Sequence, residues 1–280
     1  MSSICVVTDS SVQYSRQTFP GKDKVFQVPL PISYNGMRIE SDPQFKVTTF
    51  PARLTSDHKI SIASPSYQDW LDAFANLSQT YNEIIAITMS SNLAEVFQNL
   101  EKAARNYRGK TSITVVDSHT TSVGLGALVQ NAAAGIKCGQ SLSLIEQNVR
   151  GLIPSIYTQI TTSNLSYLHE SGYITEPQAV LGEAISILPV FSLEEGRLMA
   201  TNKVKNYHHL MDISHEFIDE FSELDQVAII QGQPPSLDTH TLREYVTSNF
   251  SGVLFTELPL NLVHASLFGP SSVSIFAIEK

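Results

Sequence analysis

The sequence predicts an α/β fold: a doubly wound parallel sheet domain with a small β-ribbon insertion, followed by an α+β domain. Three apolar runs carry the first part of this prediction, because each run ends in a small cluster of serine, threonine and aspartate. The runs are Ile4–Val7 into Thr8-Asp9-Ser10-Ser11, Ile84–Ile87 into Thr88-Met89-Ser90-Ser91-Asn92, and Ile113–Val116 into Asp117-Ser118-His119-Thr120. An apolar run rich in isoleucine and valine, followed by hydroxyl residues and a helical pattern, is typical of a buried parallel strand that leads into a helix N-cap.

The three polar clusters also indicate where a ligand would bind. Parallel strands of one sheet end at a common edge, and open α/β sheets bind their ligands at that edge. Hydroxyls and backbone N–H groups there favour an anionic group. Ser90 and Ser91 are the strongest candidates, because one oxygen is enough to cap a helix and the second hydroxyl is left for a carboxylate or phosphate.

Residues 25–40 are expected to form the β-ribbon, and this ribbon is expected to be attached to the main sheet. Pro29 and Pro31 exclude a helix there, and Tyr34-Asn35-Gly36-Met37 has the composition of a hairpin turn. The next segment, residues 48–54, has only a weak helical pattern.

A loop is expected at residues 60–66, and Ser64 or Ser66 is placed to cap the helix after it. That helix has Trp70 and Phe74 at helical spacing. Further helices are expected near residues 93–105 and 122–136, each following one of the apolar runs. The alternation of strand and helix in this half favours a parallel, doubly wound sheet.

From about residue 151 the order of elements changes. Strands are expected at 156–161, 187–191, 198–200, 227–231, 253–257 and 273–278, and helices at 141–152, 164–170, 178–185, 208–220 and 239–247. Hairpin-like connections mixed with helices indicate an α+β arrangement. The predicted domains are therefore residues 1–153 and 154–280.

Composition narrows the class of protein. The 280 residues are 42% apolar and 16% charged, as in a folded chain, and the net charge is −9. This balance argues against nonspecific binding to nucleic acid, and it leaves at most a transient contact with an anionic membrane. The sequence has neither a signal peptide pattern nor a run of roughly 20 apolar residues. Only Cys5 and Cys138 are present, so a cytoplasmic location is expected.

The acidic and histidine residues offer weaker candidates. Asp9, at the end of a strand, could be a nucleophile or a metal ligand, but no acidic residue follows two positions later, and a turn-organising role is favoured. His208, His209 and His215 lack the spacing of a metal site. No cofactor motif is present, neither a phosphate loop nor a dinucleotide fingerprint. His264 stands close to the last strand, where a loop can return to the ligand edge.

The order and spacing of several short motifs resemble the DegV family of bacterial fatty-acid-binding proteins over essentially the whole chain. The motifs are Thr8-Asp9-Ser10-Ser11, Val28-Pro29-Leu30-Pro31-Ile32-Ser33-Tyr34-Asn35-Gly36, Ala63-Ser64-Pro65-Ser66, Ile87-Thr88-Met89-Ser90-Ser91-Asn92-Leu93, Val115-Val116-Asp117-Ser118, Gly124-Leu125-Gly126 and Leu165-Ser166-Tyr167-Leu168.

The resemblance implies an α/β domain followed by an α+β domain, with a long-chain fatty acid held between them. It places the carboxylate near Ser90 and Ser91, adds Ser64 from the preceding loop, and matches His264 to the family's histidine. It also implies a chain without catalysis of its own, in which a separate fatty-acid kinase is the partner that phosphorylates the bound acid. No metal is implied.

The chain departs from the family pattern at several of these positions. Ile62 stands where the family usually has threonine, Leu93-Ala94-Glu95-Val96 replaces Leu-Ser-Gly-Thr, and Ser171-Gly172-Tyr173 replaces Gly-Gly-Arg. The family's arginine contacts the anion in kinase-linked members, so Tyr173 weakens the expectation of a kinase partner. Two alternatives stay open: a Mg²⁺-dependent phosphatase or phosphotransferase that uses Asp9, and a regulatory module without a ligand.

Overall fold

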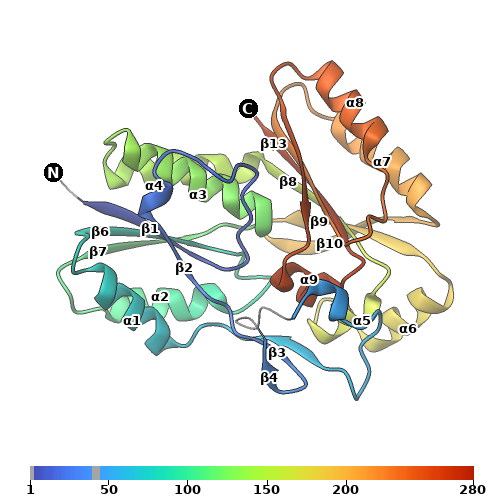
Figure 1. Cartoon of the computed structure of the whole chain (residues 1–280), viewed down its shortest axis with the longest axis horizontal. Helices are drawn as coiled ribbons and strands as arrows, with labels where there is room; N and C mark the ends of the chain where they lie inside the picture. Colours follow the sequence, from blue (N-terminus) through green and yellow to red (C-terminus); the bar gives the residue numbers. More distant parts are fainter. Residues whose placement is uncertain (1–2, 40–44) are drawn as a thin grey trace. The chain divides into compact units, whose positions relative to one another are not determined.

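The computed structural model describes residues 3–39 and 45–280, and its helices and strands are labelled in Figure 1. The contacts between residues divide the chain into two compact units. Unit 1 consists of Met1–Pro31, Ala63–Pro154 and Glu195–Arg197, and unit 2 consists of Ile32–Ile62, Ser155–Glu194 and Leu198–Lys280. The division into folding domains at residues 153 and 154 stays a prediction.

Unit 1 is built on a four-stranded sheet in which every strand is parallel to its neighbours. The order is β2 (Val25–Val28), β1 (Ile4–Asp9), β6 (Glu83–Thr88) and β7 (Ser112–Asp117). Residues of β1 and β6 are almost all buried, as expected for strands covered on both faces. The doubly wound parallel sheet that the apolar runs predicted is therefore confirmed.

Four helices flank this sheet in two pairs. They are α1 (Tyr67–Leu77), α2 (Val96–Asn106), α3 (Ser122–Lys137) and α4 (Leu142–Leu152). In Figure 1, α3 and α4 lie on one side of the sheet and α1 and α2 on the other. Helix α1 begins where expected, because the Ser66 side chain accepts the Asp69 N–H and Asp69 accepts the Ser66 N–H, which forms a capping box. Trp70 and Phe74 on the inner face of α1 are completely buried.

The register of the sheet places the three polar clusters at one edge. Thr8 of β1 is opposite Ile87 of β6, and Thr88 of β6 is opposite Asp117 of β7. The carboxyl ends of β1, β6 and β7 are therefore level, as expected from the sequence.

Unit 2 contains a six-stranded mixed sheet. Its order is β10 (Arg197–Val204), β9 (Leu188–Glu194), β8 (Ile156–Thr161), β13 (Val273–Glu279), β11 (Leu224–Gln231) and β12 (Leu254–Pro259). Strands β11 and β12 form a parallel pair, whereas β13 is antiparallel to both β8 and β11, and β8 is antiparallel to β9. Helices α7 (Tyr207–Asp219) and α8 (His240–Asn249) supply Leu210, Ile218, Leu242 and Val246 to the core of this unit. The remaining helices of unit 2 are α5 (Leu165–Glu170), α6 (Glu176–Ala184) and α9 (Leu262–Phe268).

The β-ribbon differs from its prediction in how it pairs. Strands β3 (Ile32–Tyr34) and β4 (Met37–Arg38) form the expected hairpin, and Asn35 and Gly36 have the positive φ angles that such a tight turn requires. This hairpin pairs with β5 (Ile60–Ile62) in a small sheet of its own, so the expected loop at 60–66 begins with a strand. Strand β2, by contrast, joins the main sheet. Residue 40, the predicted end of the ribbon, lies outside the described residues.

The weak helical pattern at residues 48–54 corresponds to a single 3₁₀ turn, η2 (Val47–Thr49). The other short 3₁₀ turns are η1 (Lys22–Lys24) and η3 (Ile153–Ser155). Within residues 3–39 and 45–280, no helix is both long enough and apolar enough to cross a membrane. The cytoplasmic location stays a prediction.

Candidate functional site

Asp9 joins the ends of two parallel strands at the polar edge of unit 1. Its Oδ1 accepts the Ser11 N–H (2.8 Å) and its Oδ2 accepts the Met89 N–H (2.7 Å), so both carboxylate oxygens are occupied. Burial raises the pKa of this carboxyl, and the hydrogen bonds from Ser11 and Met89 lower it in part. The residue after Met89 is Ser90, so Asp9 fixes the backbone at the start of the serine cluster.

The segment that follows β6, here called the serine turn, is Ser90–Ala94. Its first two N–H groups bond to β7 and the loop after it: Ser90 N–H donates to the Thr120 carbonyl (2.8 Å), and Ser91 N–H donates to Asp117 Oδ1 (3.1 Å). The acidic side chain of Asp117 therefore occupies a position at which a free N–H could have held an anion.

The other N–H groups of the serine turn fold back onto Ser90. Asn92 N–H donates to Ser90 Oγ (3.2 Å), and the N–H groups of Leu93 and Ala94 donate to the Ser90 carbonyl (3.0 and 3.3 Å). All five backbone donors of the turn are thus used within the protein. The expectation that free N–H groups of this turn would hold an anion is not met, and side-chain hydroxyls are left for that role.

The two serine hydroxyls have different surroundings. Ser90 is completely buried, and its Oγ donates to the Gly196 carbonyl (2.9 Å). Ser91 is half-buried, and among the described residues its hydroxyl has no hydrogen-bond partner. Its carbonyl accepts from the Gln98 amide (3.3 Å), which holds the backbone of Ser91 against the start of α2. Ser91 therefore presents the open hydroxyl of the pair.

Ser64 is connected to the same helix. Its hydroxyl donates to the Pro65 carbonyl (3.0 Å) and accepts from Nδ2 of Asn99 (3.0 Å). Asn99 follows Gln98 directly, so two consecutive side chains of α2 hold the Ser64 loop and the serine turn. This connection groups Ser64, Ser90 and Ser91 around the first turns of one helix in unit 1.

Glu195–Arg197 of the β9–β10 hairpin also belong to unit 1, and the first two of these residues contact the serine turn. The Glu195 carbonyl accepts from the Asn92 side-chain amide (3.2 Å), in addition to the Gly196–Ser90 bond. The sequence predicts a turn at residues 193–197 but gives it no role in the site, because a contact between residues 106 positions apart leaves no local pattern.

His264 is in unit 2, on α9, and is buried. Its Nε2 lies 2.7 Å from Ser274 Oγ, and its ring packs against Phe268 with the centroids 4.8 Å apart. Burial lowers the pKa of this imidazole to about 3, so the ring is neutral at physiological pH. The Nδ1 atom is buried and has no hydrogen-bond partner among the described residues.

Tyr173, which stands where the family motif has arginine, stacks on Phe268, the same ring that packs against His264. Its ring lies 6.0 Å from that of Phe268 with an angle of 22° between the planes, and burial raises the pKa of its phenol. The rings of His264 and Tyr173, on either side of Phe268, are therefore uncharged at neutral pH.

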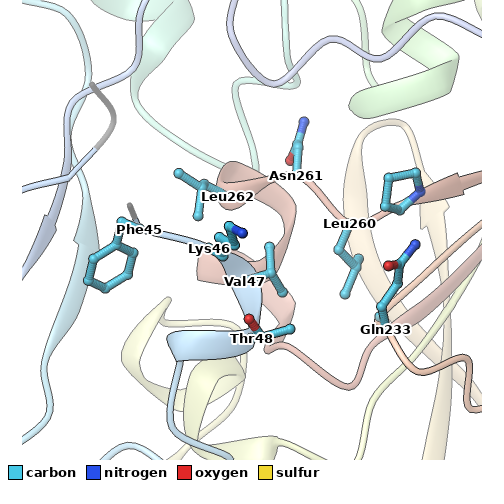
Figure 2. A pocket seen from close by; sticks show the side chains of 10 residues that line it. Phe45, Lys46, Val47, Thr48, Gln233, Leu260, Asn261 and Leu262 are labelled. Carbon is cyan, nitrogen blue, oxygen red and sulfur yellow. The ribbon is translucent and has the colours of Figure 1, made fainter. Parts of the chain in front are cut away.

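A cavity of about 340 Å³ opens in unit 2 beside the start of α9. Figure 2 shows side chains from residues 45–48 on one side of it and those of Gln233 and Leu260 on another. The lining is mainly apolar, with the exposed Lys46 as its charged residue. None of the four predicted ligand-binding residues lines this cavity.

The possible metal ligands, histidine, cysteine, aspartate and glutamate, all occur in the part of the chain that the structure describes, residues 3–39 and 45–280. Within it, no group of three histidine, cysteine, aspartate or glutamate side chains is placed to hold a metal ion. Cys5 is buried in β1 and Cys138 is exposed, and both are free thiols.

The fold and the serine turn together define a class: a two-unit α/β protein with a hydroxyl-lined polar edge suited to hold a small polar group. A family model described as "Uncharacterised protein, DegV family" matches residues 3–280. This chain belongs to the DegV family.

Individual relatives agree with this assignment. The chain is 28% identical over 204 residues to a DegV domain-containing protein of Deinococcus radiodurans, covering 72% of each. A solved fatty-acid-binding DegV family protein from Thermus thermophilus matches with 23% identity and a TM-score of 0.81, over 99% of this chain and 100% of that one. The fatty acid kinase B3 protein of Streptococcus pneumoniae, solved with linoleic acid, has 17% identity and a TM-score of 0.85, over 99% and 100%. At these identities the solved structures establish the fold.

Proposed function

We propose that this protein binds a long-chain fatty acid and that the hydroxyl of Ser91 donates a hydrogen bond to the acid's carboxyl group. Family membership supports the ligand class, as do the structural neighbours described as fatty-acid-binding or as loaded with linoleic acid. The observation that carries the assignment is the contrast within the serine turn: every N–H and the Ser90 hydroxyl are used internally, whereas the Ser91 hydroxyl is open.

In this proposal the acyl chain supplies most of the affinity. A chain of roughly 14 methylenes contributes about 11 kcal/mol of gross transfer free energy at about 0.8 kcal/mol each. Association and the ordering of the chain offset a large part of this gain. One neutral hydroxyl adds only about 1 kcal/mol, so its main effect is to orient the carboxyl end.

The other predicted ligand residues have supporting roles. Ser90 shapes the turn, because its Oγ already donates to Gly196 and accepts from Asn92. Ser64 acts through Asn99 on the same helix. His264 offers Nδ1 as a neutral hydrogen-bonding atom, since its ring carries no charge near pH 7.

We assign no catalysis to the chain itself: it holds the acid, and a separate kinase would carry out any phosphorylation. The neighbour described as a fatty acid kinase B3 protein supports this division of labour. The rival assignment, a phosphotransferase that uses Asp9, requires a carboxylate oxygen free to attack or to bind Mg²⁺. Both oxygens of Asp9 accept backbone N–H groups instead. Incubation with Mg²⁺ and generic phosphoesters is expected to give no turnover.

Mass spectrometry tests the ligand directly. Protein purified from a bacterial host and measured under native conditions is expected to carry an added mass that matches a C16–C18 acid. After lipid removal, Ser91→Ala should bind palmitate about fivefold more weakly, which corresponds to the loss of about 1 kcal/mol. Ser143→Ala, at an exposed position on α4, is the matched control and should bind like the wild type. Repeated preparations without lipid, together with no measurable palmitate binding, would refute the proposal.

A further inference from the structure

The tip of the β9–β10 hairpin is a two-residue turn that fits closely against the serine turn. Glu195 and Gly196 have φ angles of 48° and 77°, and this pair of positive values is the combination found in tight β-hairpins. Strand β9 and the part of β10 from Leu198 onward belong to unit 2, whereas Glu195–Arg197 belongs to unit 1. The hairpin tip thus belongs structurally to the polar edge of unit 1, although most of the hairpin belongs to unit 2.

Gly196 approaches the serine turn so closely that no larger residue fits. A Cβ atom built on Gly196 would lie 2.1 Å from Ser90 Oγ, 3.0 Å from Ser90 Cβ and 3.0 Å from the Cα of His119. The Gly196 carbonyl accepts the Ser90 hydroxyl, and the carbonyl next to it accepts the Asn92 amide. Glycine is therefore required here for a close approach as well as for its backbone conformation.

We propose that Gly196 is a positioning residue for the fatty-acid carboxyl site, and that the hairpin tip determines which of the two adjacent serines faces the ligand. By accepting the Ser90 hydroxyl, the tip removes that donor and leaves Ser91 as the open one. The inference rests on the proposed function, because it names the part of the fold that sets the geometry of that site.

The remaining contacts of the turn explain why the tip is needed. Asp117 and Gln98 hold the backbone of Ser91 through its N–H and carbonyl, whereas the hydroxyl of Ser90 donates to the Gly196 carbonyl. If the tip moved away, the Ser90 hydroxyl would lose its acceptor, and a second donor would be released next to Ser91. The serine turn would then lose a hydrogen bond that fixes its shape, so the Ser91 hydroxyl would be held less precisely and palmitate would bind more weakly.

The test uses the lipid-free full-length protein, palmitate as the probe, and two matched glycine variants. Gly196→Ala places a methyl group against Ser90. Gly139→Ala, in unit 1, has the same left-handed backbone (φ 73°) but no atom within 4 Å of the added carbon, so it controls for the conformational cost alone. Asn92→Ala removes only the side-chain bond to Glu195 at an exposed position, and it serves if Gly196→Ala does not fold.

We expect Gly196→Ala to weaken palmitate binding about tenfold, which equals about 1.4 kcal/mol, and Asn92→Ala to weaken it about threefold. Gly139→Ala should bind like the wild type. Amide hydrogen exchange of a peptide that covers residues 88–95 should speed up in Gly196→Ala and Asn92→Ala but not in Gly139→Ala.

Two outcomes distinguish a failure of the positioning role of Gly196 from a failure of the proposed fatty-acid binding. If the wild type binds palmitate and Gly196→Ala binds it equally well, with unchanged exchange at residues 88–95, the positioning role is wrong and the proposed function stands. If the wild type binds no palmitate, the proposed function itself fails and the positioning role fails with it.

Discussion

The carboxylate of Asp9 accepts the backbone N–H of Met89 at 2.7 Å and so links the carboxyl ends of β1 and β6 immediately before the serine turn. Its second oxygen accepts the N–H of Ser11, two residues further along its own chain segment. A residue that suggests catalysis in the sequence is therefore a structural link between two strands.

Replacing this carboxylate by an amide should destabilise the protein. Asp9→Asn keeps the size of the side chain but offers one acceptor oxygen where two backbone N–H groups need two. One buried N–H is left without a partner, at a cost of about 1–3 kcal/mol. Urea unfolding of Asp9→Asn should show this loss, whereas Asp212→Asn, exposed on α7, should unfold like the wild type. Equal stability of Asp9→Asn and the wild type would contradict the structural role.

The pH dependence of stability should show a contribution from His264. Burial lowers its folded-state pKa from 6.5 to about 3, so between these values the unfolded chain binds a proton that the folded chain does not. Stability is then fully present above pH 6.5 and decreases as the pH falls toward 3, by up to about 1.4 kcal/mol per pH unit.

Comparison with a variant isolates this contribution. Between pH 6 and pH 5 the free energy of unfolding of the wild type should fall by about 1 kcal/mol more than that of His264→Gln, which has no imidazole to titrate. Parallel curves for the wild type and His264→Gln would mean that folding does not lower the pKa of His264.

Removing the charge of Asp117 should strengthen the binding of an ionised fatty acid. Its carboxylate accepts the N–H of Ser91 (3.1 Å), so a carboxylate at the Ser91 hydroxyl would approach a like charge. Asp117→Asn keeps an oxygen for the N–H groups of Ser91 and His119 and removes roughly 1 kcal/mol of repulsion. Titration with palmitate at pH 8 should give about fivefold higher affinity. Unchanged or weaker binding would place the carboxyl group away from Ser91.

Regular secondary structure was largely predictable because it depends on local patterns. The apolar runs of β1, β6 and β7 and the Ser66 cap of α1 are each encoded within a few neighbouring residues. Strand β5 is not predictable in this way, because the alternation of Ile60–Ile62 is only three residues long and the strand owes its pairing to β3, far away in the sequence.

The arrangement of the polar edge was less predictable. The sequence indicated two adjacent serines but could not show that one of them is used internally, because Gly196 is 106 residues away. The roles of Asp117 and Asn99 likewise depend on contacts between separate elements. Composition could suggest a hydroxyl-rich edge, whereas only the tertiary structure shows which hydroxyl is open.

The position of Trp70 has a practical consequence. It is the single tryptophan of the chain, and it lies completely buried on α1, within unit 1. Its fluorescence therefore reports the unfolding of that unit alone, whereas far-ultraviolet circular dichroism records the helices and strands of both. If the two signals change at different denaturant concentrations, unfolding is not two-state and the units melt separately. If the transitions coincide, the chain behaves as one cooperative system.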